Sequence, residues 1–121
     1  DLAKWDLFTG GRVSGKIAES DAGVRAAQAQ RQSAEQAMQE QVISAFQNVR
    51  TAQLVERAAA DRADAAAQAL ESVRHEVRVG MKPQLDLLDA EREAIAASAD
   101  AVRAQTDRAV AAYQLLAVTG A

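Results

Sequence analysis

The sequence predicts an all-α fold, a long antiparallel helical hairpin of the coiled-coil kind preceded by a short strand remnant. Two residues predict the hairpin. Pro83 is the only proline of the chain, and Gly80, three residues before it, is the only glycine between Gly23 and Gly120. A glycine can take the left-handed conformation that ends a helix, and a proline suits the first turn of the next one. Because a tip at residues 79–83 is so short, the two helices must lie antiparallel.

The composition favours long helices over a globular core. The chain has 121 residues, at most one domain. Apolar residues make up 49% of it, but about half of these are alanine, and aromatic residues are only 3%. The net charge of −3 argues against nucleic acid as a partner, and the absence of cysteine excludes a disulfide scaffold or a thiolate metal site. No apolar run approaches the ~20 residues that a membrane-spanning helix needs.

Residues 1–13 are expected to hold the end of a strand and a Gly-Gly turn. Apolar and polar side chains partly alternate from Ala3 to Leu7, which suits a strand with one apolar face, and Gly10-Gly11 then interrupts the pattern. A lone strand finds no partner in this chain, so a disordered leader is the alternative.

A long helix is expected from about residue 14 to residue 78, because this segment lacks proline and, after Gly23, also lacks glycine. A helix of roughly 60 residues would be ~90 Å long and needs a packing partner along most of its length. Large apolar residues at steps of three and four, with alanine between them, mark one stripe: Met38, Val42, Phe46, Val49, Leu70, Val73 and Val77. The returning helix does not reach residues 14–42, so we expect this segment to pack on another chain or copy, or to fray.

The returning helix, at about residues 83–118, carries a more regular repeat. One row recurs every seven residues, at Leu88, Ile95, Val102, Ala109 and Leu116, with Ala99, Thr106 and Tyr113 as partner positions. Such a repeat, held over about four heptads, predicts left-handed supercoiling of this row against a neighbouring helix.

Few residues could carry chemistry, and we expect neither an enzyme nor a bound cofactor or metal. His75 is the only histidine and no cysteine accompanies it, so an exposed side chain is the default. Residues 10–16 faintly suggest a phosphate-binding loop, but Ile17 stands where that loop requires a serine or threonine.

Asp86 and Asp89 have two interpretations. Three residues apart on a helix, they lie on one face. As ordinary residues of a first turn they are stabilised by the positive end of the helix, by a few tenths to ~1 kcal/mol each, and Lys82 can pair with Asp86. A functional interpretation requires several copies that bring these carboxylates into a ring.

Three segments, in this order, resemble the motifs of one family. Trp5–Arg12 is similar to a strand-end motif in which an aromatic residue precedes Pro-Leu-Phe-x-Gly-Gly-Arg, with Asp6 in place of the usual proline. Arg78–Gly80 and Leu85–Ala90 are similar to a tip motif, Val-Gly and then Asp-Val-Leu-Asp-Ala. Ala112–Gly120 is similar to a final helix that ends in Thr-Gly or Leu-Gly. The whole chain resembles the C-terminal repeat of the TolC-like outer-membrane efflux proteins.

The resemblance implies a homotrimeric channel with a shared β-barrel in the outer membrane, and it places this chain in the helical tunnel that continues through the periplasm. Such a channel is a passive exit duct for tripartite efflux or type I secretion, and its partners are a periplasmic adaptor (membrane fusion) protein and an inner-membrane pump. The resemblance assigns roles to Asp86, Asp89 and Lys82 at the periplasmic entrance constriction, to Val79, Gly80 and Met81 at the adaptor-contacting tip, and to Trp5, Phe8, Gly10 and Gly11 at the membrane-interface end of the strand.

Two other functions stay open, both without channel activity. One is an interaction hairpin such as a periplasmic adaptor's coiled coil, although nothing in the sequence resembles the lipoyl-like β segments that would flank it. The other is a structural or surface-binding amphipathic coiled coil. It would explain the alanine-rich heptads, but not the Gly-Gly strand end or the tip motif.

Overall fold

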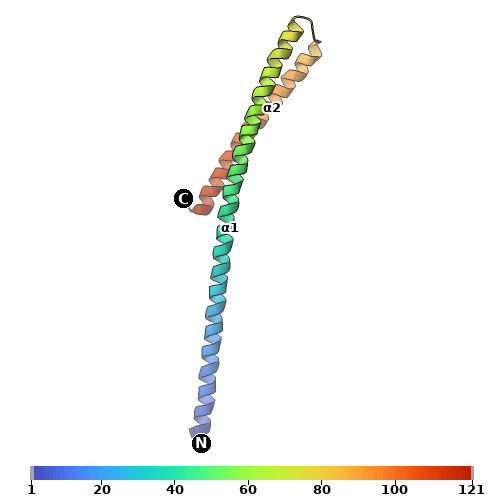
Figure 1. Cartoon of the computed structure of the whole chain (residues 1–121). Helices are drawn as coiled ribbons and strands as arrows, with labels where there is room; N and C mark the ends of the chain where they lie inside the picture. Colours follow the sequence, from blue (N-terminus) through green and yellow to red (C-terminus); the bar gives the residue numbers. More distant parts are fainter. Residues whose placement is uncertain (1, 121) are drawn as a thin grey trace. The chain divides into compact units, whose positions relative to one another are not determined.

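A computed structural model describes the backbone of residues 2–120 and the side chains of residues 10–120 (Figure 1). It contains two helices, α1 (Leu2–Arg78) and α2 (Gln84–Thr119), and no strand occurs among the described residues. The predicted all-α hairpin is therefore confirmed. The chain divides into two units, Asp1–Glu40 and Gln41–Ala121, which we name the N-terminal unit and the hairpin unit.

The described side chains of the N-terminal unit form no interior. Every side chain from residue 10 to residue 40 is exposed. The large apolar residues are no exception, since Ile17, Val24 and Met38 are 57%, 54% and 63% exposed. Among the described side chains of this unit, none covers these apolar residues.

The predicted strand remnant is not borne out. The backbone of residues 2–13 is helical and continues into the rest of α1, so no boundary separates these residues from the long helix at residue 14. A strand satisfies its N–H and C=O groups only by pairing with another strand, whereas a helix satisfies them internally. Without a pairing strand the helix is favoured, even though Gly10 and Gly11 each cost it roughly 0.5–1 kcal/mol relative to alanine.

The hairpin unit is held together by two rows of side chains that face each other, one from each helix. Each row advances by alternating steps of three and four residues, the spacing of a coiled-coil seam. The row on α1 is buried or half-buried throughout and consists of Val42, Ala45, Val49, Ala52, Glu56, Ala59, Ala63, Ala66, Leu70, Val73 and Val77. The row on α2 is likewise buried or half-buried and consists of Leu87, Ala90, Ala94, Ala97, Ala101, Ala104, Arg108, Ala111, Leu115 and Val118. We name these two rows together the alanine seam.

Alanine supplies the most buried positions of this seam. The fully buried residues are Ala45, Ala97, Ala104 and Ala111, and Ala97 is 0% exposed. Side chains this small allow two helix axes to approach to the lower end of the usual ~8–10 Å separation. Larger apolar residues lie toward the two ends of the seam, with Leu70 and Val73 near the turn. The hairpin core is consequently thin and closely spaced.

The heptad row that the sequence marks on α2 does not face α1. Leu88, Ile95, Val102 and Leu116 are 43%, 70%, 61% and 52% exposed, and the partner positions Ala99, Thr106 and Tyr113 are exposed as well. The residues that face α1 lie one position earlier. Both rows repeat every seven residues, and close helix packing places the smaller side chains between the helices. We name Leu88, Ile95, Val102, Ala109 and Leu116 the outer row.

The stripe predicted on α1 is correct only in part. Val42, Val49, Leu70, Val73 and Val77 belong to the alanine seam. Met38 and Phe46 do not, since they are 63% and 53% exposed. Phe46 lies one position beyond Ala45, which occupies the seam in its place.

Candidate functional site

The turn between the helices is built on a left-handed glycine. Gly80 has φ 83°. Its N–H donates to the Val77 carbonyl at 3.1 Å, and the Met81 N–H donates to the Glu76 carbonyl at 2.7 Å. This pair of bonds is the Schellman arrangement that satisfies the last carbonyls of a helix. A side chain at residue 80 would meet no atom within 4 Å, so the positive φ alone favours glycine there.

Pro83 leads the chain into α2. Its φ of −70° and ψ of 157° are those of extended backbone, and its carbonyl accepts the Asp86 N–H at 3.0 Å. Because proline has no N–H, residue 83 adds no unpaired donor of its own at the helix start. The turn residues 79–83 are all exposed.

Lys82 pairs across the turn with the end of α1. Its Nζ lies 2.8 Å from Glu76 Oε2, and its N–H donates to the Glu76 carbonyl at 3.3 Å. The hydrogen bond and the charge of Glu76 raise the pKa of Lys82, and the charge of Asp86 adds a smaller contribution in the same direction. The expected pairing with Asp86 is thus replaced by one with Glu76, which the turn brings closer.

Asp86 and Asp89 occupy the first turns of α2. Asp86 is half-buried and Asp89 is exposed. One face of a helix therefore presents two carboxylates beside the turn. No group of three or more histidine, aspartate or glutamate side chains in the described part of the chain could hold a metal ion. One chain supplies only two carboxylates at this place, and a ring of carboxylates would require several copies of the chain.

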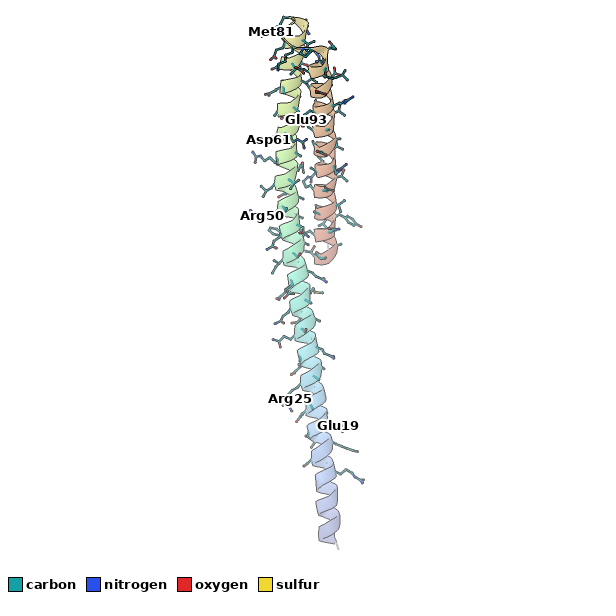
Figure 2. The ribbon with its side chains drawn as sticks, turned by 90° about the vertical axis from the view of Figure 1, so that its right-hand side faces the viewer. Glu19, Arg25, Arg50, Asp61, Met81 and Glu93 are labelled. Carbon is teal, nitrogen blue, oxygen red and sulfur yellow. The ribbon has the colours of Figure 1, made fainter. Side chains whose placement is uncertain are left out.

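Apolar side chains surround the turn. Val79, Met81 and Leu85 are 53%, 74% and 66% exposed. Figure 2 shows Met81 at the turn, where α1 and α2 meet. Leu85 was not singled out from the sequence, although its place two residues after Pro83 puts it at the same end of the hairpin. An exposed apolar cluster of this kind is typical of a contact surface.

Charged side chains link the two helices midway along the hairpin. Arg62 of α1 reaches two acids on α2, with Nη2 3.1 Å from Glu93 Oε1 and Nη1 3.0 Å from Asp100 Oδ2. Hydrogen bonds to both acids raise the pKa of Arg62. Glu56 of α1 forms an ion pair with Arg108 Nε of α2.

Sequence reasoning missed these pairs because it assigned charged residues to a solvated face. A signal was present for Glu56 and Arg108. Each interrupts an otherwise apolar heptad row of its own helix.

The outer row borders an open hollow beside the seam. Leu70, Ala94 and Ile95 form its apolar part, Arg74, Glu91 and Ser98 complete it, and its volume is about 380 Å³. The hollow and the outer row give α2 a second apolar surface, separate from the one that α1 covers.

The remaining predicted residues do not join the turn site. Trp5 and Phe8 have side chains outside the described set, and Gly10 and Gly11 lie in α1. His75 is exposed in the last turn of α1, where its carbonyl accepts the Val79 N–H at 3.1 Å. In the part of the chain that the structure describes, neither helix has a stretch long and apolar enough to cross a membrane.

Comparison with known proteins gives two matches. Residues 2–121 match the protein family described as outer membrane efflux protein. The chain is also similar to the outer membrane efflux protein BepC of Brucella suis biovar 1 (strain 1330), with 32% identity over 114 residues. That match covers 94% of this chain but 25% of the relative, so the chain spans about a quarter of its length. No solved structure matches.

Proposed function

The chain belongs to the outer membrane efflux protein family, and on that premise we propose that it is a segment of the periplasmic helical tunnel of a trimeric outer-membrane channel. The channel would be the exit duct of a tripartite efflux pump or a type I secretion system. The observation that carries the proposal is the second apolar row of α2, which the hairpin itself leaves uncovered.

A tunnel wall made of helices requires each helix to have two packed sides. A helix in a simple hairpin needs only one apolar row, because its other faces meet water. On α2 the alanine seam meets α1, while Ile95 and Val102 of the outer row are 70% and 61% exposed. Burial of a large aliphatic side chain contributes about 1.5–3 kcal/mol, so packing of this row against a neighbouring helix would stabilise the assembly substantially.

The acidic pair would acquire its function in the trimer. Three copies of the turn would place three Asp86 and three Asp89 side chains around one opening. A ring of carboxylates at a narrow pore favours cations and holds back anions. Lys82 would support the closed entrance indirectly, by fastening the start of α2 to Glu76 at the end of α1.

The exposed apolar side chains at the turn would meet the periplasmic adaptor protein, which connects the channel to an inner-membrane pump. Val79 and Met81 flank Gly80, and all three residues are exposed. Two exposed apolar side chains beside accessible backbone form a surface on which the tip of another helical hairpin can dock. Localisation follows from this proposal: the channel lies in the outer membrane and this segment in the periplasm. Assignment of Trp5, Phe8, Gly10 and Gly11 to a membrane interface stays a prediction.

The experiment that tests the proposal is planar-bilayer conductance of the full-length channel protein. Asp86→Asn combined with Asp89→Asn should raise conductance and reduce block by divalent cations, because the negative ring is removed. The matched control is Asp61→Asn with Asp64→Asn, which neutralises two exposed aspartates of the same spacing away from the turn. Conductance and divalent block that stay unchanged in the first variant would contradict the gate.

An interaction hairpin without channel activity is the second candidate. The exposed Met81 and Leu85 at the turn favour it, because they alone would suffice for a tip-to-tip contact. A folded, membrane-inserted protein that binds an adaptor but opens no channel would select this alternative.

A further inference from the structure

We propose that the Glu56–Arg108 pair is a latch that fixes the register of α2 against α1. Both residues occupy positions of the alanine seam, and they are the only charged residues in its two rows. Glu56 Oε2 is buried, and its ion-pair partner is Arg108 Nε. The two side chains are 27% and 41% exposed, so neither is freely solvated.

The rest of the middle of the seam does not define a register. The positions on either side of the latch are Ala52 and Ala59 on α1, and Ala104 and Ala111 on α2. A shift of one heptad, about 10 Å along the helix, brings alanine opposite alanine again. Apolar burial in the middle of the seam is therefore almost the same before and after the shift, and packing there does not select one register.

The latch does distinguish the two registers. A shift of one heptad would place Glu56 and Arg108 each opposite an apolar seam residue. A charge held at a partly buried seam position without its partner carries a desolvation cost that the ion pair otherwise offsets. A single polar layer in an apolar coiled coil is known to specify register for this reason.

The second interhelical link, at Arg62, permits the shift that the latch opposes. Acidic residues recur on α2 every seven positions, at Asp86, Glu93, Asp100 and Asp107. Arg62 contacts the two central members, and Asp107 lines the same hollow as Arg62. After a shift by one heptad in either direction, Arg62 would again lie between two acids. We name these four acids the acidic rail.

The structure thus combines a rail that tolerates a one-heptad shift with a latch that prevents it. Shifts of one element past another by a discrete step are an established form of conformational switching. The shift would also have to break the hydrogen bonds by which Gly80, Met81 and Lys82 cap the end of α1, so the helix ends next to the turn would rewind with it. The latch acts within one hairpin, whether or not the protein forms a channel.

Cysteine cross-linking in the full-length protein measures the register directly, since the described chain contains no cysteine of its own. Ala59 and Ala104 line the same hollow, so Ala59→Cys with Ala104→Cys reports the observed register. Ala59→Cys with Ala97→Cys, or with Ala111→Cys, reports a shift of one heptad in either direction. Each pair is oxidised with copper phenanthroline, and intrachain disulfides are counted by loss of free thiols in the fraction that runs as a monomer on non-reducing electrophoresis.

With the latch intact, only the first pair should form a disulfide readily. Arg108→Met should raise cross-linking of one shifted pair at least about tenfold, because the polar layer no longer selects the register. The matched control is Arg74→Met, which removes an ion pair with Glu71 within α1 and should leave all three rates unchanged. Shifted pairs that stay at background in Arg108→Met would overturn the latch.

Two further variants separate a shift from simple misfolding. Glu56→Arg with Arg108→Glu restores a pair of opposite orientation and should return cross-linking to the observed register. Failure of this exchange to restore it would also overturn the latch. In the Arg108→Met background, Arg62→Met should reduce the shifted cross-link. An unchanged level of this cross-link would show that Arg62 and the acidic rail do not stabilise the shifted register.

Discussion

The two rows of α2 differ in a way that separates their roles. The α2 row of the alanine seam is mostly alanine and is covered by α1, whereas the outer row has mostly large aliphatic side chains and is uncovered. In an isolated hairpin the larger residues would be expected inside, where they bury the most area. Here the small residues lie inside and the large ones outside. This distribution allows the two helices of the hairpin to approach closely and leaves the large apolar side chains available for contact with another helix.

The largest expected effect comes from enlarging a seam residue. Ala97→Leu adds three carbons at a position that is 0% exposed, and we expect it to lower the free energy of unfolding by about 1–3 kcal/mol through overpacking. Val102→Leu adds one carbon in the outer row and should change that free energy by less than about 0.5 kcal/mol. Urea unfolding followed by circular dichroism measures both. Equal effects of the two substitutions on the free energy of unfolding would contradict the claim that only the seam row is closely packed.

A smaller effect is expected from making the outer row polar. Ile95→Gln with Val102→Gln should leave the hairpin folded but weaken assembly by about 1–2 kcal/mol per protomer, because the two side chains no longer gain from burial. The measurement is trimer dissociation on heating, followed by semi-native electrophoresis. The control is Val55→Gln with Leu54→Gln, two exposed α1 residues outside the outer row. A trimer as stable as the wild type would show that the outer row meets no neighbour.

The smallest effect concerns the turn, where neither row contributes. Because Glu76 raises the pKa of Lys82 above the ordinary 10.5, the folded state binds this proton more tightly than the unfolded state. The resulting stabilisation is fully present at neutral pH and is lost as pH rises through the raised pKa. Lys82→Met should therefore lower Tm slightly at neutral pH and not at strongly alkaline pH, as calorimetry would show. An equal difference at both pH values would mean that the methionine affects packing and not charge.

The hairpin and its turn could be predicted because glycine and proline impose backbone geometry locally. The row of α2 that faces α1 could not be predicted, since both rows repeat every seven residues. Only the distance between the two helices decides whether the row of Leu87 or the row of Leu88 faces α1. The same uncertainty concealed the latch, because Glu56 and Arg108 are recognisable as partners only once the seam is known. Lys82 was assigned to Asp86 along one helix, whereas the turn brings Glu76 closer.

The N-terminal prediction failed for a different reason. Alternation in residues 1–8 indicates a strand only if another strand is available to pair with it, and residues 2–120 supply none. The acidic pair was placed correctly at the start of α2, but a ring depends on other copies, which no local pattern specifies.

The most direct test of the two-row account is thiol labelling of Ala104→Cys and Val102→Cys, before and after assembly of the full-length protein. Ala104 is 5% exposed and Val102 is 61% exposed, although they are two residues apart. Ala104→Cys should react slowly in both states, which verifies the hairpin. Val102→Cys should react rapidly before assembly and slowly afterwards, because a neighbouring helix covers it. Rapid labelling of Val102→Cys in the assembled protein would contradict the claim that the outer row is a helix contact.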